Sequence, residues 1–84
     1  MVVQDSAFDP HFETIFAKIK DPLLKERIKK QIRKIIQNPE IGKPMRNLRK
    51  GTREFYVKPF RLSYIYLQEE NKVVFLDFYH KDEQ

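Results

Sequence analysis

The 84-residue sequence has no cysteine, two histidines and two glycines. Without cysteine the chain can form neither disulfides nor thiolate metal sites, and two histidines alone give no metal-ligand spacing. Neither a glycine-rich phosphate loop nor a Gly-x-Ser-x-Gly nucleophile elbow is present. We therefore expect any chemistry of this chain to use charged and aromatic side chains, with no metal and no cofactor.

Long apolar runs are also missing. No stretch approaches the roughly 20 apolar residues that span a bilayer, and no signal-peptide pattern opens the chain. There are no repeats or low-complexity tracts. We expect a soluble, cytoplasmic protein that forms one domain over residues 1–84. A domain of this size buries only about 60% of the surface of its unfolded chain, so its core is small.

Positive charge is in excess and unevenly distributed. The chain has 17 Lys and Arg against 12 Asp and Glu, a net charge of +5. Within residues 43–61 the one acid is Glu54, and the basic residues are Lys43, Arg46, Arg49, Lys50, Arg53, Lys58 and Arg61. Such a density favours a polyanionic partner, because each phosphate contact releases counterions. The alternative is a solvated face that aids solubility.

The first half of the chain predicts two helices. Asp9 is expected to be an N-cap and Pro10 the first helical residue, and Asp21 and Pro22 have the same two roles in the second helix. Asn38–Pro39 ends the second helix. The apolar stripes consist of Phe12, Ile15, Phe16 and Ile19 in the first helix and Leu24, Ile28, Ile32, Ile35 and Ile36 in the second. The short joint between the helices predicts an antiparallel hairpin.

The second half predicts strands. Residues 39–52 hold prolines and both glycines and are expected to form a loop, and from Arg53 onward the apolar period is two. The Lys58–Pro59 corner and a turn at residues 69–72 separate three strands, and residues 1–4 offer a further short edge strand. The predicted fold is α+β, with the helical hairpin on one face of a small, mostly antiparallel three- to four-stranded sheet.

Alternation assigns the strand residues to two faces. The helix-facing set is Val57, Leu62, Tyr64, Val74, Leu76 and Phe78, and the uncovered face receives Glu54, Tyr56, Lys58, Arg61, Ser63, Asp77 and Tyr79. By the same count His80 points inward, unless a bulge changes the parity or the strand ends before it.

Residue types on the uncovered face suit metal-free RNA cleavage. This reaction needs a base for the ribose 2′-hydroxyl, a cation on the phosphoryl oxygens and an acid for the leaving 5′-oxygen. Arg61 suits the phosphate, and His80 can do either proton transfer near neutral pH. Two simpler interpretations stay open: Arg61 pairs with Asp77 across the strands, and His80 is a frayed terminal residue. His11, in the first helical turn, receives no role.

At this point the chain resembles the RelE/ParE toxin superfamily of toxin–antitoxin modules. The resemblance covers the order of elements and rests on a Gly42-Lys43-Pro44 loop, Gly51, the Arg61–Tyr64 segment "RLSY" and an apolar strand that ends in His80 and a basic residue. Members of the RelE and YoeB branches are ribosome-dependent endoribonucleases that cut mRNA in the A site.

The resemblance implies roles by position. Arg61 is similar to the arginine that stabilises the transition state, and Lys58 matches the second of two RelE lysines, with Tyr56 in the place of the first. Tyr79-His80 looks like the terminal Tyr-His of YoeB-type toxins, with the histidine as acid, and Lys81 falls where many relatives have arginine. The predicted catalytic residues are thus Glu54, Lys58, Arg61 and His80, and the predicted RNA contacts are Arg46, Arg49, Lys50, Arg53, Tyr56, Tyr79 and Lys81.

The sequence departs from this pattern at two positions. No tyrosine follows Lys81, and Pro44-Met45 occupy the neighbourhood of the YoeB-type glutamate base, so Glu54 is assigned as base from its face alone. The ParE branch shares the fold but inhibits DNA gyrase, and a non-catalytic RNA-binding or decayed toxin is a third interpretation. The expected partners are mRNA, the ribosome and an acidic, partly disordered antitoxin that covers the basic groove and folds on binding.

Overall fold

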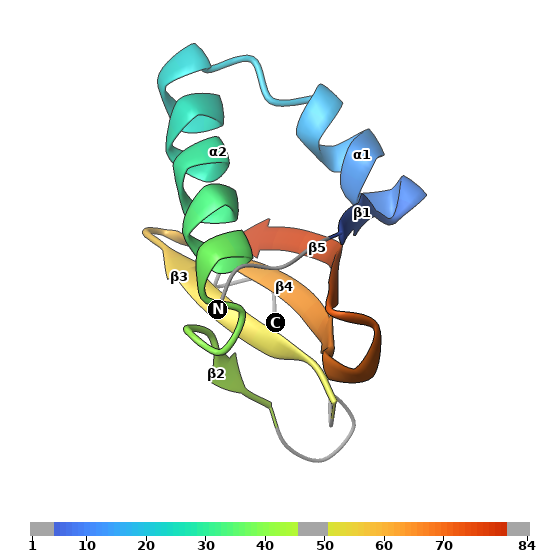
Figure 1. Cartoon of the computed structure of the whole chain (residues 1–84). Helices are drawn as coiled ribbons and strands as arrows, with labels where there is room; N and C mark the ends of the chain where they lie inside the picture. Colours follow the sequence, from blue (N-terminus) through green and yellow to red (C-terminus); the bar gives the residue numbers. More distant parts are fainter. Residues whose placement is uncertain (1–4, 46–50, 81–84) are drawn as a thin grey trace.

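A computed structural model describes residues 5–45 and 51–80 of the chain. Its elements are β1 (Asp5–Phe8), α1 (Pro10–Ala17), α2 (Pro22–Gln37), β2 (Lys43–Pro44), β3 (Arg53–Val57), β4 (Phe60–Leu67), the 3-10 turn η2 (Gln68–Glu70) and β5 (Lys72–His80). The two helices lie together on one side of a curved sheet (Figure 1). In the described part of the chain, no helix is long and apolar enough to cross a membrane.

The sheet has five strands in the order β1-β5-β4-β3-β2. All neighbours are antiparallel except β1, which runs parallel to β5. The α+β class is confirmed, and the sheet has one strand more than the upper end of the predicted three to four. β2 is a two-residue strand inside the expected loop, and β1 lies at Asp5–Phe8, whereas the predicted residues 1–4 are outside the described range.

Both helices begin where the sequence predicts. The carboxylate oxygens of Asp9 and Asp21 each accept the backbone N–H two residues ahead, at 2.9 Å, and a proline opens each helix. These caps satisfy N–H groups that have no partner within the helix. The hairpin is antiparallel as expected, and its helices diverge so that α1 packs on β5 and α2 on β3.

The core fills the space between the helices and one face of the sheet. Its fully or nearly buried apolar side chains are Phe12, Ile28, Ile32, Ile35, Val57, Leu62, Tyr64, Val73, Phe75 and Phe78. The predicted stripes of both helices therefore face the core, with Phe12 and three isoleucines of α2 at their centres. The opposite face of the sheet carries the polar set described below.

A β-bulge changes the parity of β5. Ser63 pairs with Asp77, but the next residue of β4, Tyr64, pairs with Phe75, so Leu76 is the extra residue. The prediction that Val74 and Leu76 belong to the core is therefore wrong. The bulge reverses the two faces for the residues of β5 that precede it, so Val73 and Phe75 are buried instead. Beyond the bulge the predicted parity holds, with Phe78 buried.

Tyr64 fastens the loop after α2 to the core. Its side chain is fully buried, and its hydroxyl donates to the Pro39 carbonyl at 2.7 Å and accepts from the Gly42 N–H at 2.8 Å. Burial raises the pKa of this phenol, against smaller opposing effects of the Gly42 N–H and the Arg53 charge. A Cβ at Gly42 would lie 2.4 Å from the hydroxyl oxygen, so this position requires glycine.

We expect Tyr64→Phe to lower the free energy of unfolding by about 1–3 kcal/mol, since two buried backbone groups lose their partner. Because the folded-state pKa of Tyr64 is raised, wild-type stability should fall as pH rises above the ordinary tyrosine value of 10.0. The variant should lose less stability over the same range. Urea unfolding of both proteins from pH 8 to pH 11 measures this, and parallel pH dependences would contradict it.

Candidate functional site

Two polar rows cross the face of the sheet opposite the helices. Strand register places Tyr56, Arg61 and Tyr79 side by side on β3, β4 and β5. The neighbouring row consists of Glu54, Ser63 and Asp77. Since directly paired residues share a face, the predicted assignment of these six residues to the face opposite the helices is confirmed, although Glu54 and Ser63 are buried there.

Glu54 joins the two rows. Its Oε1 lies 3.3 Å from Nη1 of Arg61, and its Oε2 accepts a hydrogen bond from the Tyr79 hydroxyl. The carboxylate side chain is only 5% exposed, whereas Arg61 is 36% exposed. A buried carboxylate is stable when an adjacent cation and hydrogen-bond donors compensate its charge, and Arg61 and Tyr79 provide both. The alternative pairing of Arg61 with Asp77 is thus wrong.

Arg61 has donor capacity left for a ligand. A guanidinium carries five N–H donors, and among the described residues Arg61 uses one, toward Glu54. The ion pair holds the side chain in place, and the side chain remains partly exposed. A planar cation fixed in this way is suited to bind two oxygens of a phosphate at once.

Aromatic rings flank this cation on both sides. Tyr56 is 49% exposed on β3, and Tyr79 is half-buried on β5. Ring faces beside an arginine are the usual platform for unstacked nucleobases in single-stranded RNA. The row therefore offers one phosphate position between two positions for bases.

Two further predicted cations lie outside the row. Lys58 is exposed in the turn between β3 and β4, where its carbonyl accepts a 2.6 Å hydrogen bond from Nη2 of Arg27 in α2. Arg53 faces the helix side, and its Nη1 donates to the carbonyls of Glu40 and Gly42 at 3.1 and 2.7 Å. Arg53 thus holds the loop after α2, which is a structural task that its basic charge did not reveal.

The structure separates His80 from Arg61. His80 pairs with Phe60, a residue of the helix-facing side, and its ring meets the Phe60 ring edge-on at 5.4 Å between centroids. Tyr79, its neighbour, lies on the opposite face. The inward direction that the alternation count gives His80 is therefore confirmed, because strand β5 continues through residue 80 without a second parity change, and His80 does not share a face with Glu54 and Arg61.

His11 is the contact that sequence reasoning missed. Its Nε2 lies 3.3 Å from Asp77 Oδ1, and the same Asp77 oxygen accepts the Phe78 N–H at 2.7 Å. No sequence signal links the first turn of α1 to β5 at this distance along the chain. The remaining predicted contacts Arg46, Arg49, Lys50 and Lys81 lie outside the described residues. Among the described residues, no three His, Asp or Glu side chains gather as a metal site.

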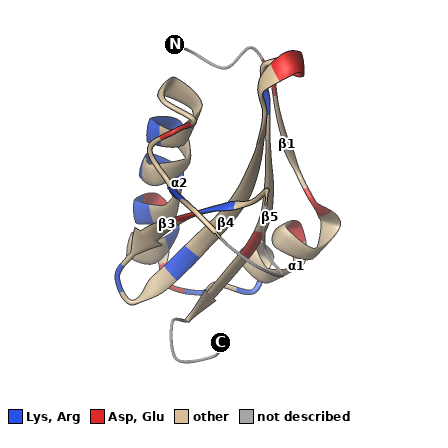
Figure 2. Ribbon diagram, turned by 90° about the horizontal axis from the view of Figure 1, so that it is seen from below, with Lys and Arg blue, Asp and Glu red and all other residues tan. Residues whose placement is uncertain are grey.

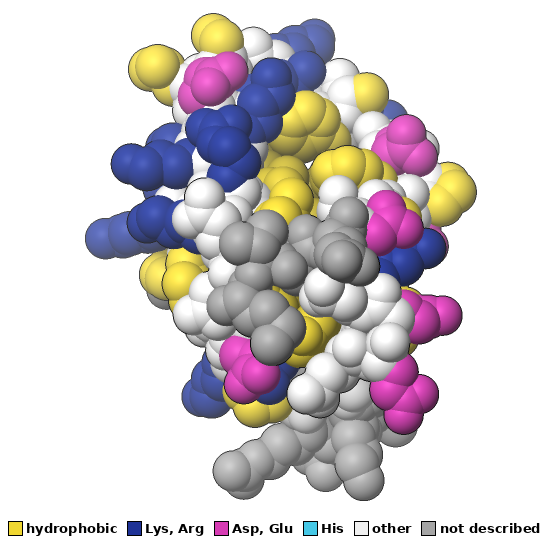
Figure 3. Space-filling model, in the orientation of Figure 1, with side chains coloured by type: hydrophobic (Ala, Val, Ile, Leu, Met, Phe, Trp, Pro, Cys, Tyr) yellow, Lys and Arg dark blue, Asp and Glu magenta, His cyan; other side chains and the backbone are white. Residues whose placement is uncertain are grey.

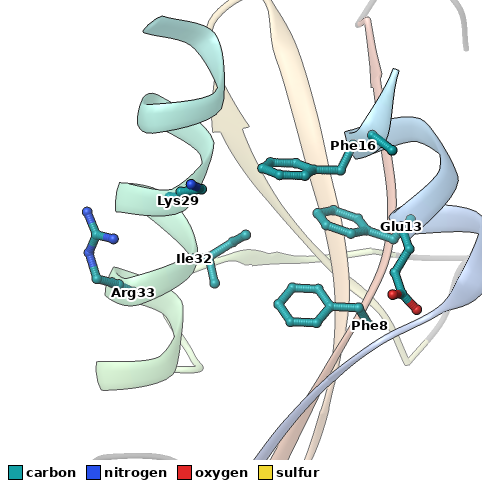
Figure 4. Close-up of a pocket in the computed structure, with 8 residues that line it drawn as sticks. Phe8, Glu13, Phe16, Lys29, Ile32 and Arg33 are labelled. Atoms are coloured by element: carbon teal, nitrogen blue, oxygen red, sulfur yellow. The ribbon is translucent and has the colours of Figure 1, made fainter. Parts of the chain in front are cut away.

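A second candidate site lies between the two helices. There a groove of about 400 Å³ is lined by Phe8, Phe12, Glu13, Phe16, Ala17, Lys29, Ile32 and Arg33. The labelled phenylalanine rings point across the groove toward Ile32, and Lys29 and Arg33 project from α2, with Arg33 on the side away from the rings (Figure 4). Apolar atoms make up most of its surface, so it can receive an apolar side chain or a short helix face.

Basic residues concentrate along α2 beside this groove. They are Lys25, Arg27, Lys29, Lys30, Arg33 and Lys34, against one acid, Glu26. Figure 3 shows these cations over α2 with apolar side chains visible next to them, and Figure 2 shows the same charges along the helix ribbon. The helix side of the molecule thus combines an apolar groove with a positively charged wall.

Comparison with known proteins places this fold and sequence in one family. The family model of ParE toxins of the type II toxin–antitoxin system parDE matches residues 7–84. No curated protein sequence is significantly similar to the chain.

Solved structures agree with this match. The Mycobacterium tuberculosis RelBE2 toxin–antitoxin complex is 24% identical with a TM-score of 0.84, covering 96% of this chain and 94% of that one. A double mutant of the Escherichia coli RelE toxin in the free state is 17% identical (TM-score 0.82; 100% of this chain and 88% of that one covered). A YoeB/ParE toxin from Agrobacterium tumefaciens is 13% identical (TM-score 0.80; 90% and 96% covered). These likenesses show the RelE-type fold, and with the family match they confirm the resemblance found in the sequence: the chain belongs to the ParE/RelE family of toxins of type II toxin–antitoxin systems.

Proposed function

We propose that this toxin is a metal-independent endoribonuclease that cuts mRNA in the ribosomal A site. The observation that carries the proposal is the fixed guanidinium of Arg61, which stands between Tyr56 and Tyr79 with donors to spare. A ribosome presents mRNA as an unpaired strand, which this row of one phosphate position and two base positions fits.

The proposed reaction is an internal phosphoryl transfer. The ribose 2′-oxygen attacks the adjacent phosphorus, and the products are a 2′,3′-cyclic phosphate and a 5′-hydroxyl. Arg61 holds the phosphoryl oxygens and stabilises the charge that grows on them. Tyr56 stacks on a base, and Lys58, exposed in the adjoining turn, contacts the backbone of the RNA.

Primer extension on a defined mRNA in a cell-free translation system tests this proposal. We expect cuts at A-site codons that appear only when ribosomes are present, and that persist in EDTA-treated toxin. Intact mRNA at toxin concentrations that stop growth would contradict the proposal.

Inhibition of DNA gyrase is the second candidate. It is favoured by the family match to ParE toxins over residues 7–84 and by the position of His80 away from Arg61. A supercoiling assay with purified gyrase distinguishes the two, because a gyrase inhibitor blocks supercoiling without cutting mRNA.

A cognate antitoxin is the proposed partner. The similar M. tuberculosis structure is a toxin–antitoxin complex, and an E. coli RelE structure is in complex with an antitoxin RelB peptide. We place one anchor of the antitoxin in the groove between α1 and α2, where an amphipathic acidic segment would meet both the phenylalanines and Lys29 and Arg33.

Reversing the charge of the groove wall should weaken this complex. We expect Lys29→Glu/Arg33→Glu to raise the antitoxin Kd roughly tenfold at low salt, with a smaller effect at high salt. Titration calorimetry at two salt concentrations measures the change. Lys30→Glu together with Lys34→Glu is the matched control, since these cations of the same helix do not line the groove. Equal losses in both double variants would contradict the assigned position.

A further inference from the structure

Glu54 cannot itself reach a substrate. Its side chain is 5% exposed, and its two oxygens are directed to Arg61 and to the Tyr79 hydroxyl. A general base must come within hydrogen-bond distance of the proton that it removes. The carboxylate therefore acts through a group that it holds, and among the described residues Arg61 and Tyr79 are such groups.

Of these two groups, Tyr79 is the one able to exchange a proton. Arginine stays protonated in proteins, whereas a phenol can accept a proton if it passes its own to a neighbour at the same time. Tyr79 stands directly beside Arg61 in strand register and donates its hydroxyl hydrogen to Glu54 Oε2. A base held in orientation by a buried carboxylate is the arrangement that hydrolytic triads use.

We propose that Tyr79 and Glu54 are the proton-transfer couple of this face, an inference that rests on the proposed ribonuclease function. The 2′-hydroxyl gives its proton to the Tyr79 oxygen as the phenolic proton moves to Glu54 Oε2. The freed electron pair forms the bond from the 2′-oxygen to phosphorus. The bond from phosphorus to the 5′-oxygen breaks, and that oxygen takes a proton from water. Glu54 ends the step protonated and returns its proton to solvent through Tyr79.

Two other titratable groups near this face are engaged elsewhere. Asp77 binds His11 and the Phe78 N–H, and His80 packs against Phe60 on the helix side. Of the two tyrosines beside Arg61, Tyr79 is the one whose hydroxyl donates to a carboxylate among the described residues. The couple thus gives Tyr79 a chemical task in addition to stacking on a base.

Single-turnover cleavage in the translation system separates these two tasks. Tyr79→Phe keeps the ring and removes only the hydroxyl, so a stacking residue would tolerate it. We expect a loss of about 10²–10³-fold in the cleavage rate, and a similar loss for Glu54→Gln. The double variant should be no slower than the slower single variant, because the two groups act as a unit. Tyr66→Phe, which removes a hydroxyl on the other face of the same sheet, is the matched control and should cleave like wild type.

The pH profile excludes a merely structural role. Wild-type cleavage should slow as pH falls, because a proton acceptor takes part in the step, and this acid limb should be absent in Glu54→Gln. If Tyr79→Phe cleaves mRNA at the wild-type rate, the proton-transfer couple is overturned and the ribonuclease function is kept. Wild-type protein that leaves mRNA intact would overturn the ribonuclease function and the couple with it. Circular dichroism and melting curves confirm that each variant is folded.

Discussion

Arg61→Ala is expected to reduce mRNA cleavage by about 10³-fold, the largest loss from any single change on this face. Arg61 is the fixed cation of the Tyr56–Arg61–Tyr79 row, and among the described residues it uses one of its five donors, toward Glu54. Arg61→Lys should recover little of the rate, because an ammonium cannot bind two oxygens in a plane. The measurement is the single-turnover rate of A-site cleavage.

Two controls separate this loss from other causes. The substitution leaves Glu54 buried without its cation, so we expect a stability cost of about 1–3 kcal/mol, and the rate must be measured where the variant is folded. Lys30→Ala removes an equal charge from the outer face of α2, outside the helix groove and the sheet face. If Lys30→Ala lowers the rate as much as Arg61→Ala, general charge explains the activity and the site assignment fails.

The helices could be predicted because their signals are local. Asp9-Pro10 and Asp21-Pro22 each place a cap and a preset backbone angle where the helix starts, and the apolar stripes face the core. The edge strands are different. Lys43–Pro44 is a strand only because β3 lies beside it, and a two-residue strand has no period that a sequence can show.

Alternation predicted the faces of β5 correctly only on the C-terminal side of the bulge. Strict alternation assigned Val74 and Leu76 to the core, yet Val73 and Phe75 are there, because Leu76 is an extra residue with no local signal. A single insertion of this kind reverses every side chain on one side of it. Beyond it, Asp77 and Tyr79 lie where the sequence predicted.

The candidate site was predictable in its members but not in its connections. Charge and alternation identified Glu54, Arg61 and Tyr79 as neighbours on one face. They did not reveal that the acid is buried, or that it binds the cation and the phenol together, since those contacts depend on the distances across three strands. His80 was assigned to the site by its likeness to relatives. The sequence left open whether a bulge changes its face, and in the structure its ring lies on the helix-facing side, against Phe60.

Phe75→Ala is expected to cost about 3–5 kcal/mol of unfolding free energy, the largest stability loss in the described core. Phe75 is fully buried, and its ring lies 5.3 Å from Phe8, 6.0 Å from Phe12 and 6.1 Å from Tyr64, centroid to centroid. It thereby joins β1, α1, β4 and β5. The total free energy of unfolding of a native domain is roughly 5–15 kcal/mol, so this variant should be partly unfolded at 37 °C. Urea unfolding measures the loss.

Phe16→Ala is the informative contrast to Phe75→Ala. Its ring contacts Phe12 and lies under Lys25, but it is only partly buried because one side lines the helix groove. The free energy lost on truncation depends on the cavity left behind, and a groove wall open to solvent leaves little. We therefore expect a cost near 1 kcal/mol, with weakened antitoxin binding as the main effect. Equal stability losses in the two variants would mean that the groove closes in solution and that Phe16 belongs to the core.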